Sequence, residues 1–154
     1  HNVKHQSPLG YYRAQAWLAW HYGLTGIGFW SYCTSQDDPW FTPAHRHDYL
    51  LVYPGSGVVT SKRWEAVRDG VEDYMMLTAL RDAIAASNAT PETLKAAKGL
   101  LAEDAGAVAQ FCGLDEHGTL LGAEDPALAR IVADARWETV KQIRRALARL
   151  LQAL

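Results

Sequence analysis

Aromatic side chains gather in the first half of the chain, at points where short apolar runs open into polar stretches. A ring in such a position can stack on the apolar face of a sugar, while neighbouring polar groups bind the sugar hydroxyls. The same arrangement is typical of aromatic residues at the edge of a hydrophobic core. The candidates for sugar contact are Trp30, Tyr32, Trp40 and Tyr53.

Each candidate has two interpretations. Trp30 and Tyr32 close the run 26–32 and point to the same side of an extended segment, so both rings either contact a sugar or fill a core. Trp40 lies in a polar stretch and is either a sugar contact or an anchor of a loop. Tyr53 directly precedes a Pro-Gly stop, where the same two interpretations apply.

Two further groups of residues could do chemistry. His45, His47 and Asp48 have a spacing that can chelate a metal ion, but no further ligand cluster accompanies them. We therefore expect loop hydrogen bonds there, and we assign no metal and no cofactor. The one Asp-Glu dipeptide, Asp115-Glu116, follows a glycine and is expected to be a solvated turn. No catalytic residue is assigned within the chain.

The composition limits the class of protein. Of the 154 residues, 49% are apolar, which is enough for a hydrophobic core. A net charge of −2 with mixed signs gives no basic footprint for nucleic acid, and no apolar run approaches the ~20 residues of a membrane span. Cys33 and Cys112 lie outside any metal or redox spacing and are expected to be free, buried thiols. The sequence does not indicate a compartment.

The pattern of apolar residues predicts a helix, a strand, a loop, an extended segment and three more helices. Their expected ranges are 9–22, 25–32, 33–48, 49–53, 61–85, 91–113 and 126–154. Gly23 stands where a left-handed residue would end the first helix, and Ser61 is a good cap for the second. Gly70 in mid-helix costs about 1 kcal/mol relative to alanine, which indicates that another segment packs closely there.

Further expectations concern packing. Trp17 and Trp20 belong to a buried helix face. The helix over 61–85 has an apolar face made of Trp64, Val67, Val71, Tyr74, Met75 and Ile84. Arg68 and Glu72 are spaced as an i, i+4 ion pair. The same helix is expected to carry an architectural ion-pair network of Arg63, Arg68, Asp69 and Asp73.

The last helix carries apolar residues at 3–4 spacing, which is typical of a helix docked along another helix. These residues are Val140, Ile143, Leu147, Leu150 and Leu154. One or two strands cannot form a stable sheet alone. A buried-looking strand between helices therefore indicates a parallel sheet that other chain segments complete. The sequence favours the end of a larger α/β fold, mostly helical within this chain.

Four blocks within residues 9–80 resemble one family. They are Arg13-x-x-x-Trp17-x-x-Trp20-x-Tyr22-Gly23-Leu24-x-Gly26, Phe29-Trp30-Ser31-Tyr32, Leu51-x-Tyr53-Pro54-Gly55 and Ser61-Lys62-Arg63-Trp64-Glu65-x-x-Arg68-Asp69-Gly70-x-Glu72-Asp73-Tyr74. In this order they resemble the C-terminal part of the catalytic domain of glycoside hydrolase family 123 and of related uncharacterised domains. Residues 86–154 carry no part of the resemblance.

The resemblance implies a fold, because the family's catalytic domain is a (β/α)8 barrel of the TIM type. By resemblance, the helix before the last strand, the last strand, the loop over the active face and the closing helix are residues 9–22, 25–32, 33–60 and 61–85. The expected division is a barrel part over 1–85 and a C-terminal helical extension over 86–154. Barrel active sites lie at the C-terminal ends of the strands, so the four candidate aromatic residues are expected at the mouth.

The resemblance also implies a reaction. Family members are similar to substrate-assisted hexosaminidases, in which the 2-acetamido oxygen of the sugar attacks the anomeric carbon. An adjacent Asp-Glu pair on an earlier strand orients the acetamide and protonates the leaving oxygen. We therefore expect a glycan with an N-acetylhexosamine of the galactosamine type as substrate, and the upstream remainder of the barrel as partner. The chain alone is expected to be inactive. The alternatives are a non-catalytic carbohydrate-binding or structural module and a helical interaction segment.

Overall fold

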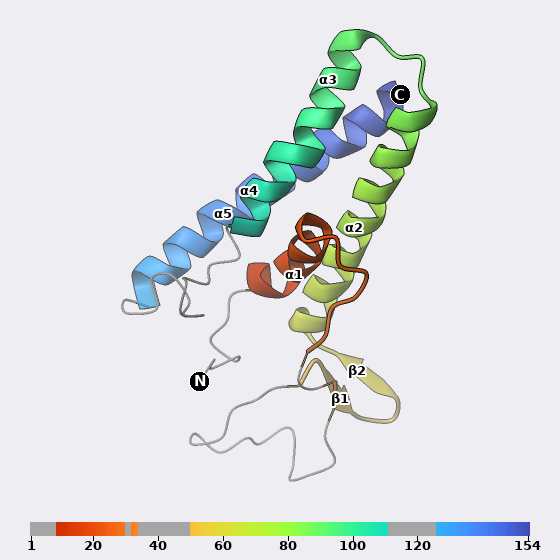
Figure 1. The fold of residues 1–154 in the computed structure, drawn as a ribbon. Helices are drawn as coiled ribbons and strands as arrows, with labels where there is room; N and C mark the ends of the chain where they lie inside the picture. The colour runs from red at the N-terminus through yellow and green to blue at the C-terminus, as the bar shows by residue number, and fades with distance from the viewer. Residues whose placement is uncertain (1–8, 30–31, 34–49, 111–125) are drawn as a thin grey trace.

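The computed structural model describes residues 9–29, 32–33, 50–110 and 126–154. Within these ranges the chain is mostly helical, as predicted, with a small two-stranded sheet. In chain order the elements are α1 (Leu9–His21), β1 (Val52–Pro54), β2 (Val58–Thr60), α2 (Lys62–Ala86), α3 (Pro91–Gly99), the π-helical turn Leu100–Asp104, α4 (Ala105–Gln110) and α5 (Pro126–Ala153). The helices pack together at one end, and the hairpin of β1 and β2 lies beside the start of α2 at the other end (Figure 1).

The end of α1 confirms the predicted helix stop. Gly23 has a φ of 66°, in the left-handed region where a side chain would be strained. The N–H of Leu24 donates to the carbonyl of Ala19 at 2.7 Å, and the N–H of Gly23 donates to the carbonyl of Trp20 at 3.1 Å. These two bonds form the Schellman motif, which satisfies the last carbonyls of a helix and turns the chain away from its axis.

The starts of the following helices also agree with the sequence. The Ser61 side chain accepts a hydrogen bond from the N–H of Trp64 at the beginning of α2, at 3.1 Å. Thr90 caps α3 through the N–H of Thr93 at 3.2 Å, and proline stands in the first turn, where its missing N–H costs nothing. The predicted starts at 61, 91 and 126 are therefore confirmed, since α3 begins at Pro91 and α5 at Pro126.

The described part of the predicted strand over 25–32, residues 25–29, forms no strand within this chain by itself. The sheet instead pairs β1 with β2 in antiparallel register, with Tyr53 opposite Val59. Only the end of the predicted extended segment 49–53 belongs to it. A segment that contains Gly26 and Gly28 has little side-chain surface to pack and needs a neighbouring strand to supply its backbone hydrogen bonds.

The close packing predicted at Gly70 is confirmed. A Cβ atom built at Gly70 would overlap the backbone carbonyl of Arg13, so glycine is what allows the backbones of α1 and α2 to approach this closely. Asp73 lies one turn further along α2 on the same buried side and is fully buried. The crossing of α1 and α2 is therefore fixed by a small residue and a buried charge.

A hydrophobic core joins α1, α2, α5 and the helical stretch from α3 to α4. Its buried members are Trp17, Leu77, Leu80, Ala97, Leu100, Ala105, Val108, Val140 and Leu147. Trp20, Ile143, Leu150 and Leu154 pack against it. The core positions predicted for Trp17, for Trp20 and for the apolar residues of α5 are therefore confirmed, and α5 is a docked terminal helix.

The predicted apolar face of α2 is wrong in part, because Val71 and Met75 are exposed. The buried side of α2 is formed by Ala66, Val67, Gly70, Asp73, Leu77 and Leu80. A buried helix face predicted from apolar periodicity takes only bulky apolar side chains into account. The side of α2 that packs on α1 is set instead by Gly70, which permits close approach, and by Asp73, which binds Arg13.

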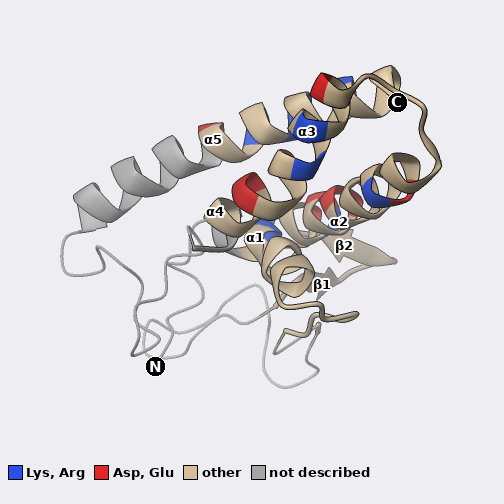
Figure 2. Ribbon diagram, turned by 45° about the horizontal axis from the view of Figure 1, so that its top comes forward, with Lys and Arg blue, Asp and Glu red and all other residues tan. Residues whose placement is uncertain are grey.

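Two further findings concern single features. Cys33 is exposed, so the prediction of a buried thiol is wrong for this residue, while Cys112 lies outside the described residues. None of the helices in the described ranges is long and apolar enough to cross a membrane. Acidic and basic residues are interleaved over the helices (Figure 2).

Candidate functional site

Two of the four predicted sugar-contact residues lie in the described part of the chain. Tyr32 is 52% exposed, and Tyr53 is half-buried in β1. Trp30 and Trp40 lie outside the described residues, as do His45, His47 and Asp48. The geometry of the candidate site is therefore built around Tyr32 and the hairpin.

The backbone of Tyr32 is fixed to the first strand of the hairpin. Its carbonyl oxygen accepts hydrogen bonds from the N–H of Leu51 at 3.2 Å and from the N–H of Val52 at 3.0 Å. Val52 directly precedes Tyr53, so the fold brings these two candidate residues to the same end of the molecule.

The ring of Tyr32 is held by a residue that the sequence interpretation assigned to the core. Trp64, in the first turn of α2, meets Tyr32 edge to face, with ring centroids 5.6 Å apart and an interplanar angle of 80°. Edge-to-face pairs contribute about 0.5–1.5 kcal/mol beyond the area they bury. Trp64 is only partly buried. An aromatic residue three positions after the helix cap is the signal that could have identified it.

The first turn of α2 also holds the chain that leads into β1. The Ser61 hydroxyl donates to the carbonyl of Leu51 at 2.6 Å, and the Arg63 guanidinium donates from Nη1 to the carbonyl of Leu50 at 2.8 Å. A hydrogen bond from a charged donor is worth more than one between neutral groups. Segment 50–52, which binds the backbone of Tyr32, is therefore tied to a rigid helix end.

A second, smaller apolar cluster lies under this site. Its buried members are Tyr12, Leu51, Ala66 and Val67, against which Ile27, Phe29 and Trp64 pack. The rings of Tyr12 and Phe29 lie 5.7 Å apart. The cluster connects α1, the segment that follows α1, the base of the hairpin and α2, so it sets where Tyr32 leaves the folded core.

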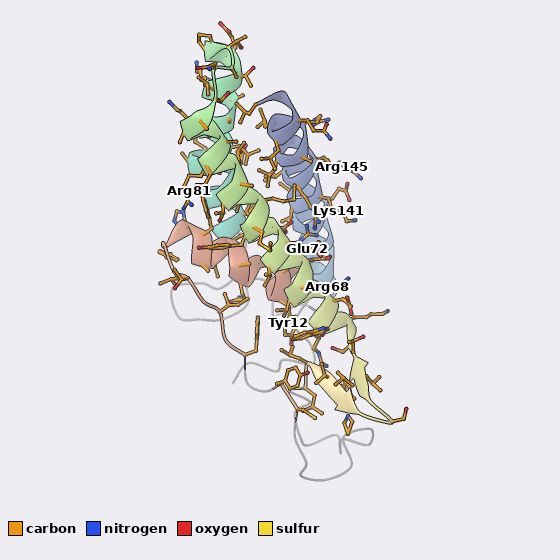
Figure 3. All side chains as sticks on the ribbon, turned by 90° about the vertical axis from the view of Figure 1, so that its right-hand side faces the viewer. Tyr12, Arg68, Glu72, Arg81, Lys141 and Arg145 are labelled. Atoms are coloured by element: carbon orange, nitrogen blue, oxygen red, sulfur yellow. The ribbon has the colours of Figure 1, made fainter. Side chains whose placement is uncertain are left out.

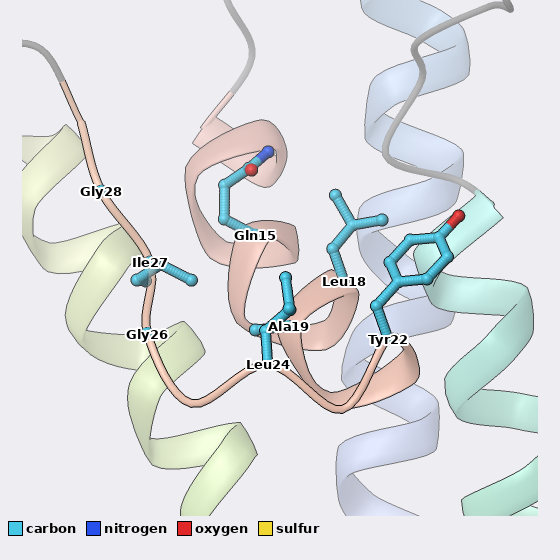
Figure 4. Close-up of a pocket in the computed structure, with 8 residues that line it drawn as sticks. All are labelled: Gln15, Leu18, Ala19, Tyr22, Leu24, Gly26, Ile27 and Gly28. Carbon is cyan, nitrogen blue, oxygen red and sulfur yellow. The ribbon is translucent and has the colours of Figure 1, made fainter.

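An apolar hollow of about 320 Å³ lies between α1 and the segment that follows α1 (Figure 4). It is lined by Gln15, Leu18, Ala19, Tyr22, Leu24, Gly26, Ile27 and Gly28. Within the described chain, the backbone of residues 26–29 forms no hydrogen bond. The hollow and the unpaired backbone lie side by side, and no charged side chain lines the hollow.

The buried carboxylate of Asp73 belongs to the architecture. One oxygen accepts from Arg13 Nε at 2.5 Å and from Trp17 Nε1 at 2.9 Å, and the other accepts from Arg13 Nη2 at 2.8 Å. Arg144 Nη1 lies 3.2 Å from that second oxygen. Both oxygens of this fully buried carboxylate are therefore held by structural partners.

The predicted ion pairs of α2 are architectural, but their partners differ from those expected. Arg68 pairs with Glu65 at 2.8 Å, so the predicted pair of Arg68 with Glu72 is wrong. Glu72 instead pairs with Arg144 of α5 at 3.0 Å. Figure 3 shows Glu72 on the side of α2 that faces α5. Sequence spacing indicates only partners within one helix, and it misses those that packing brings from another.

The side chain of Trp20 packs against α2. Its ring packs edge to face with Tyr74 at 5.6 Å, and the Arg81 guanidinium lies 5.8 Å from the ring centroid. The hydrogen bond to Asp82 raises the pKa of Arg81, so this cation stays charged beside the indole. The Tyr74 hydroxyl donates to the carbonyl of Leu24 at 3.2 Å and fixes the chain as it leaves α1.

No group of three or more His, Cys, Asp or Glu side chains that could hold a metal ion occurs in the described ranges. The described site is thus an exposed aromatic ring on a fixed backbone.

The family follows from the sequence itself. The sequence model of the glycoside hydrolase 123 catalytic domain matches residues 2–80, which is more than half of the chain. The chain belongs to glycoside hydrolase family 123. The predicted family is confirmed, and the match supports a glycoside hydrolase. Comparisons with curated proteins and with solved structures gave no match.

The match covers all the residues that build the candidate site of this family 123 chain. It includes α1, the hairpin and the first three quarters of α2, and it ends before α3. The single Asp-Glu dipeptide, at Asp115-Glu116, lies outside it.

Proposed function

We propose that this chain forms the C-terminal part of a family 123 barrel and supplies the aromatic rim of its substrate site. In this proposal α1 precedes the last strand, residues 25–32 are that strand, and α2 is the closing helix. Within the part of the chain that the structure describes, the backbone of residues 26–29 forms no hydrogen bond and lies beside an apolar hollow, which supports the proposal because a strand needs partners at its edges. The upstream part of the barrel supplies those partners.

The proposed reaction is hydrolysis of glycans that contain an N-acetylhexosamine, of the N-acetylgalactosaminide type, with assistance from the substrate. The 2-acetamido oxygen attacks the anomeric carbon, and an Asp-Glu pair from an upstream strand orients the acetamide and protonates the leaving oxygen. Asp115-Glu116 lies beyond the residues that match the family and has no part in this scheme. The chain contributes substrate contacts, and the catalytic pair comes from elsewhere in the hydrolase.

The observation that carries the proposal is the position of Tyr32. Its ring is 52% exposed, its carbonyl is bound to β1, and Trp64 holds the ring edge to face. A ring that is fixed before substrate binds loses little conformational freedom when a sugar stacks on it. Barrel active sites lie at the C-terminal ends of strands, which is where Tyr32 stands in the proposed strand. Trp30, Trp40 and Tyr53 are proposed for the same rim.

The experiment replaces Tyr32 by alanine in the complete hydrolase and measures KM and kcat on a chromogenic N-acetylgalactosaminide. Loss of one stacking contact of about 0.5–1.5 kcal/mol predicts that kcat/KM falls about 2- to 10-fold. Tyr32→Phe, which keeps the ring, should retain most of the activity. The matched control is Tyr22→Ala, because Tyr22 is 68% exposed but lines the hollow at the other end of the segment.

Two results would contradict the proposal. Equal effects of Tyr32→Ala and Tyr22→Ala on kcat/KM would remove Tyr32 from the substrate site. A lower melting temperature with unchanged KM and kcat would make Tyr32 a structural residue. A complete protein that binds the glycan but does not hydrolyse it would favour a carbohydrate-binding module.

A further inference from the structure

The C-terminal helix α5 lies outside the residues that match the family, yet it reaches the buried charge at the centre of the helical core. Arg144 Nη1 lies 3.2 Å from an Asp73 oxygen, and Arg144 Nη2 lies 3.0 Å from a Glu72 oxygen. Asp73 is fully buried and Arg144 is 31% exposed. We propose that Arg144 sets the register of α5 on α2, so that only one of several packings allowed by the apolar residues is populated.

The apolar residues of α5 do not define a single register. Val140 and Leu147 are buried and lie seven residues apart, and Leu154 follows after another seven. A displacement of α5 that brings Leu147, Leu150 and Leu154 to the places of Val140, Ile143 and Leu147 keeps apolar residues at these three places. Seams with this spacing are known to slip or change partners unless a polar residue distinguishes the registers.

Such a displacement changes what faces Asp73. It brings Leu151 to the place of Arg144, and leucine carries no charge. Asp73 then keeps Arg13 and Trp17 but loses its second cation, and Glu72 loses its partner on α5. Removing one partner from a buried ion pair is costly, so the displaced packing is disfavoured although these three places keep apolar residues.

The basic residues on either side of Arg144 do not share this role. Lys141 pairs with Glu138 at 3.2 Å and Arg145 lies 3.9 Å from the same glutamate, so both ion pairs stay within α5. Figure 3 shows α2 and α5 side by side, with Arg145 further along α5 than Lys141. Arg145 is 69% exposed and is therefore a matched control for removal of a positive charge.

The pair also links α5 to α1. Arg13 of α1, Asp73 of α2 and Arg144 of α5 meet at one carboxylate, and Asp69 lies 3.8 Å from Arg13. Asp73 therefore contacts the residue that is proposed to set the register of α5, and it also fixes the crossing of α1 and α2. The extension is part of the folding unit that carries the family residues, and Arg144 aligns it.

The experiment measures the distance between spin labels on α2 and α5 of the 154-residue chain by double electron–electron resonance. The labels are placed on the exposed positions Lys62 and Gln152 after substitution by cysteine, with Cys33 and Cys112 replaced by serine. In the labelled chain that keeps Arg144, a single distance between the two labels is expected. Arg144→Met should give a second or broadened distance with unchanged helix content by circular dichroism, while Arg145→Met should keep the single distance.

A relocated arginine gives the sharper test. In the double variant R144L/L151R the cation moves by seven residues, which corresponds to about 10 Å along a helix axis. If Arg144 sets the register, α5 follows the cation to Asp73 and the label distance shortens. Asp73→Asn in the same background should remove that shift.

Each other outcome contradicts the proposal. An unchanged single distance in Arg144→Met and in R144L/L151R would mean that apolar packing alone sets the register. Unfolding of both variants would mean that Arg144 supplies stability and does not choose between packings.

Discussion

The two ends of this molecule differ in how much of their apolar surface and backbone is packed or hydrogen-bonded within the described chain. At the helical end, α1, α2, α5 and the stretch from α3 to α4 share a closed hydrophobic core, and no buried side-chain nitrogen or oxygen in the described residues lacks a partner. At the hairpin end, Tyr32, Val58 and Val59 are exposed. The backbone of residues 26–29 forms no hydrogen bond within the described chain.

The family residues run through both ends, and the difference separates their roles. The helical end is completed by residues beyond the family match, since Val140 and Leu147 of α5 belong to the same core cluster as Trp17 and Leu80. The hairpin end presents an aromatic ring and an unpaired segment. Stability therefore concentrates at the helical end, and the contacts proposed for substrate and for the rest of the barrel concentrate at the hairpin end.

The largest expected effect is a loss of stability at the helical end. Asp73→Ala leaves the buried Arg13 guanidinium without its carboxylate, and loss of one partner of a buried pair costs about 3–5 kcal/mol. Urea unfolding of the 154-residue chain measures the free energy of unfolding. The control is Asp69→Ala, whose half-exposed carboxylate lies 3.8 Å from Arg13 and should matter by no more than about 1 kcal/mol. Equal losses in the two variants would contradict the central role of Asp73.

A smaller effect is expected where α1 crosses α2. Gly70→Ala forces a methyl group onto the Arg13 carbonyl and should destabilise the chain by about 1–3 kcal/mol, although alanine is the better helix former. Gly99→Ala in α3 is the matched control, because a Cβ there meets open space and should stabilise by up to about 1 kcal/mol. Thermal unfolding followed by circular dichroism measures both. A change in stability of the same sign in both variants would contradict the close approach of α1 and α2 at Gly70.

The smallest effect is expected at the hairpin end. Val58→Thr changes an exposed residue of β2 and should alter the free energy of unfolding of the chain by less than about 0.5 kcal/mol. A loss as large as that of Gly70→Ala would mean that the hairpin is part of the stabilising core. The comparison between the two ends would then fail.

The sequence allowed the helices to be predicted because their signals are local. Gly23, Ser61 and Thr90 act through their own backbone or their own hydroxyl, so their meaning does not depend on the rest of the fold. The glycine at position 70 also indicated a close neighbour, although the sequence could not identify Arg13 as that neighbour.

What the sequence could not indicate depends on contacts between distant segments. Val71 and Met75 fit an apolar face by spacing, but the crossing at Gly70 turns α2 so that both are exposed. Glu72 has Arg68 at helical spacing, yet α5 brings Arg144 to it. Trp64 packs against the second apolar cluster, as its place on the predicted apolar face implies, but its contact with Tyr32 could not be predicted because the hairpin brings that residue to the start of α2.

The central claim is that residues 26–29 are a strand whose partners lie in the upstream part of the catalytic barrel. Amide hydrogen exchange of Gly26, Ile27, Gly28 and Phe29 tests it most directly, measured in the 154-residue chain and in the complete hydrolase. The account predicts fast exchange in the chain alone and slow exchange, as in a paired strand, in the complete hydrolase. Equally fast exchange in both proteins would contradict it.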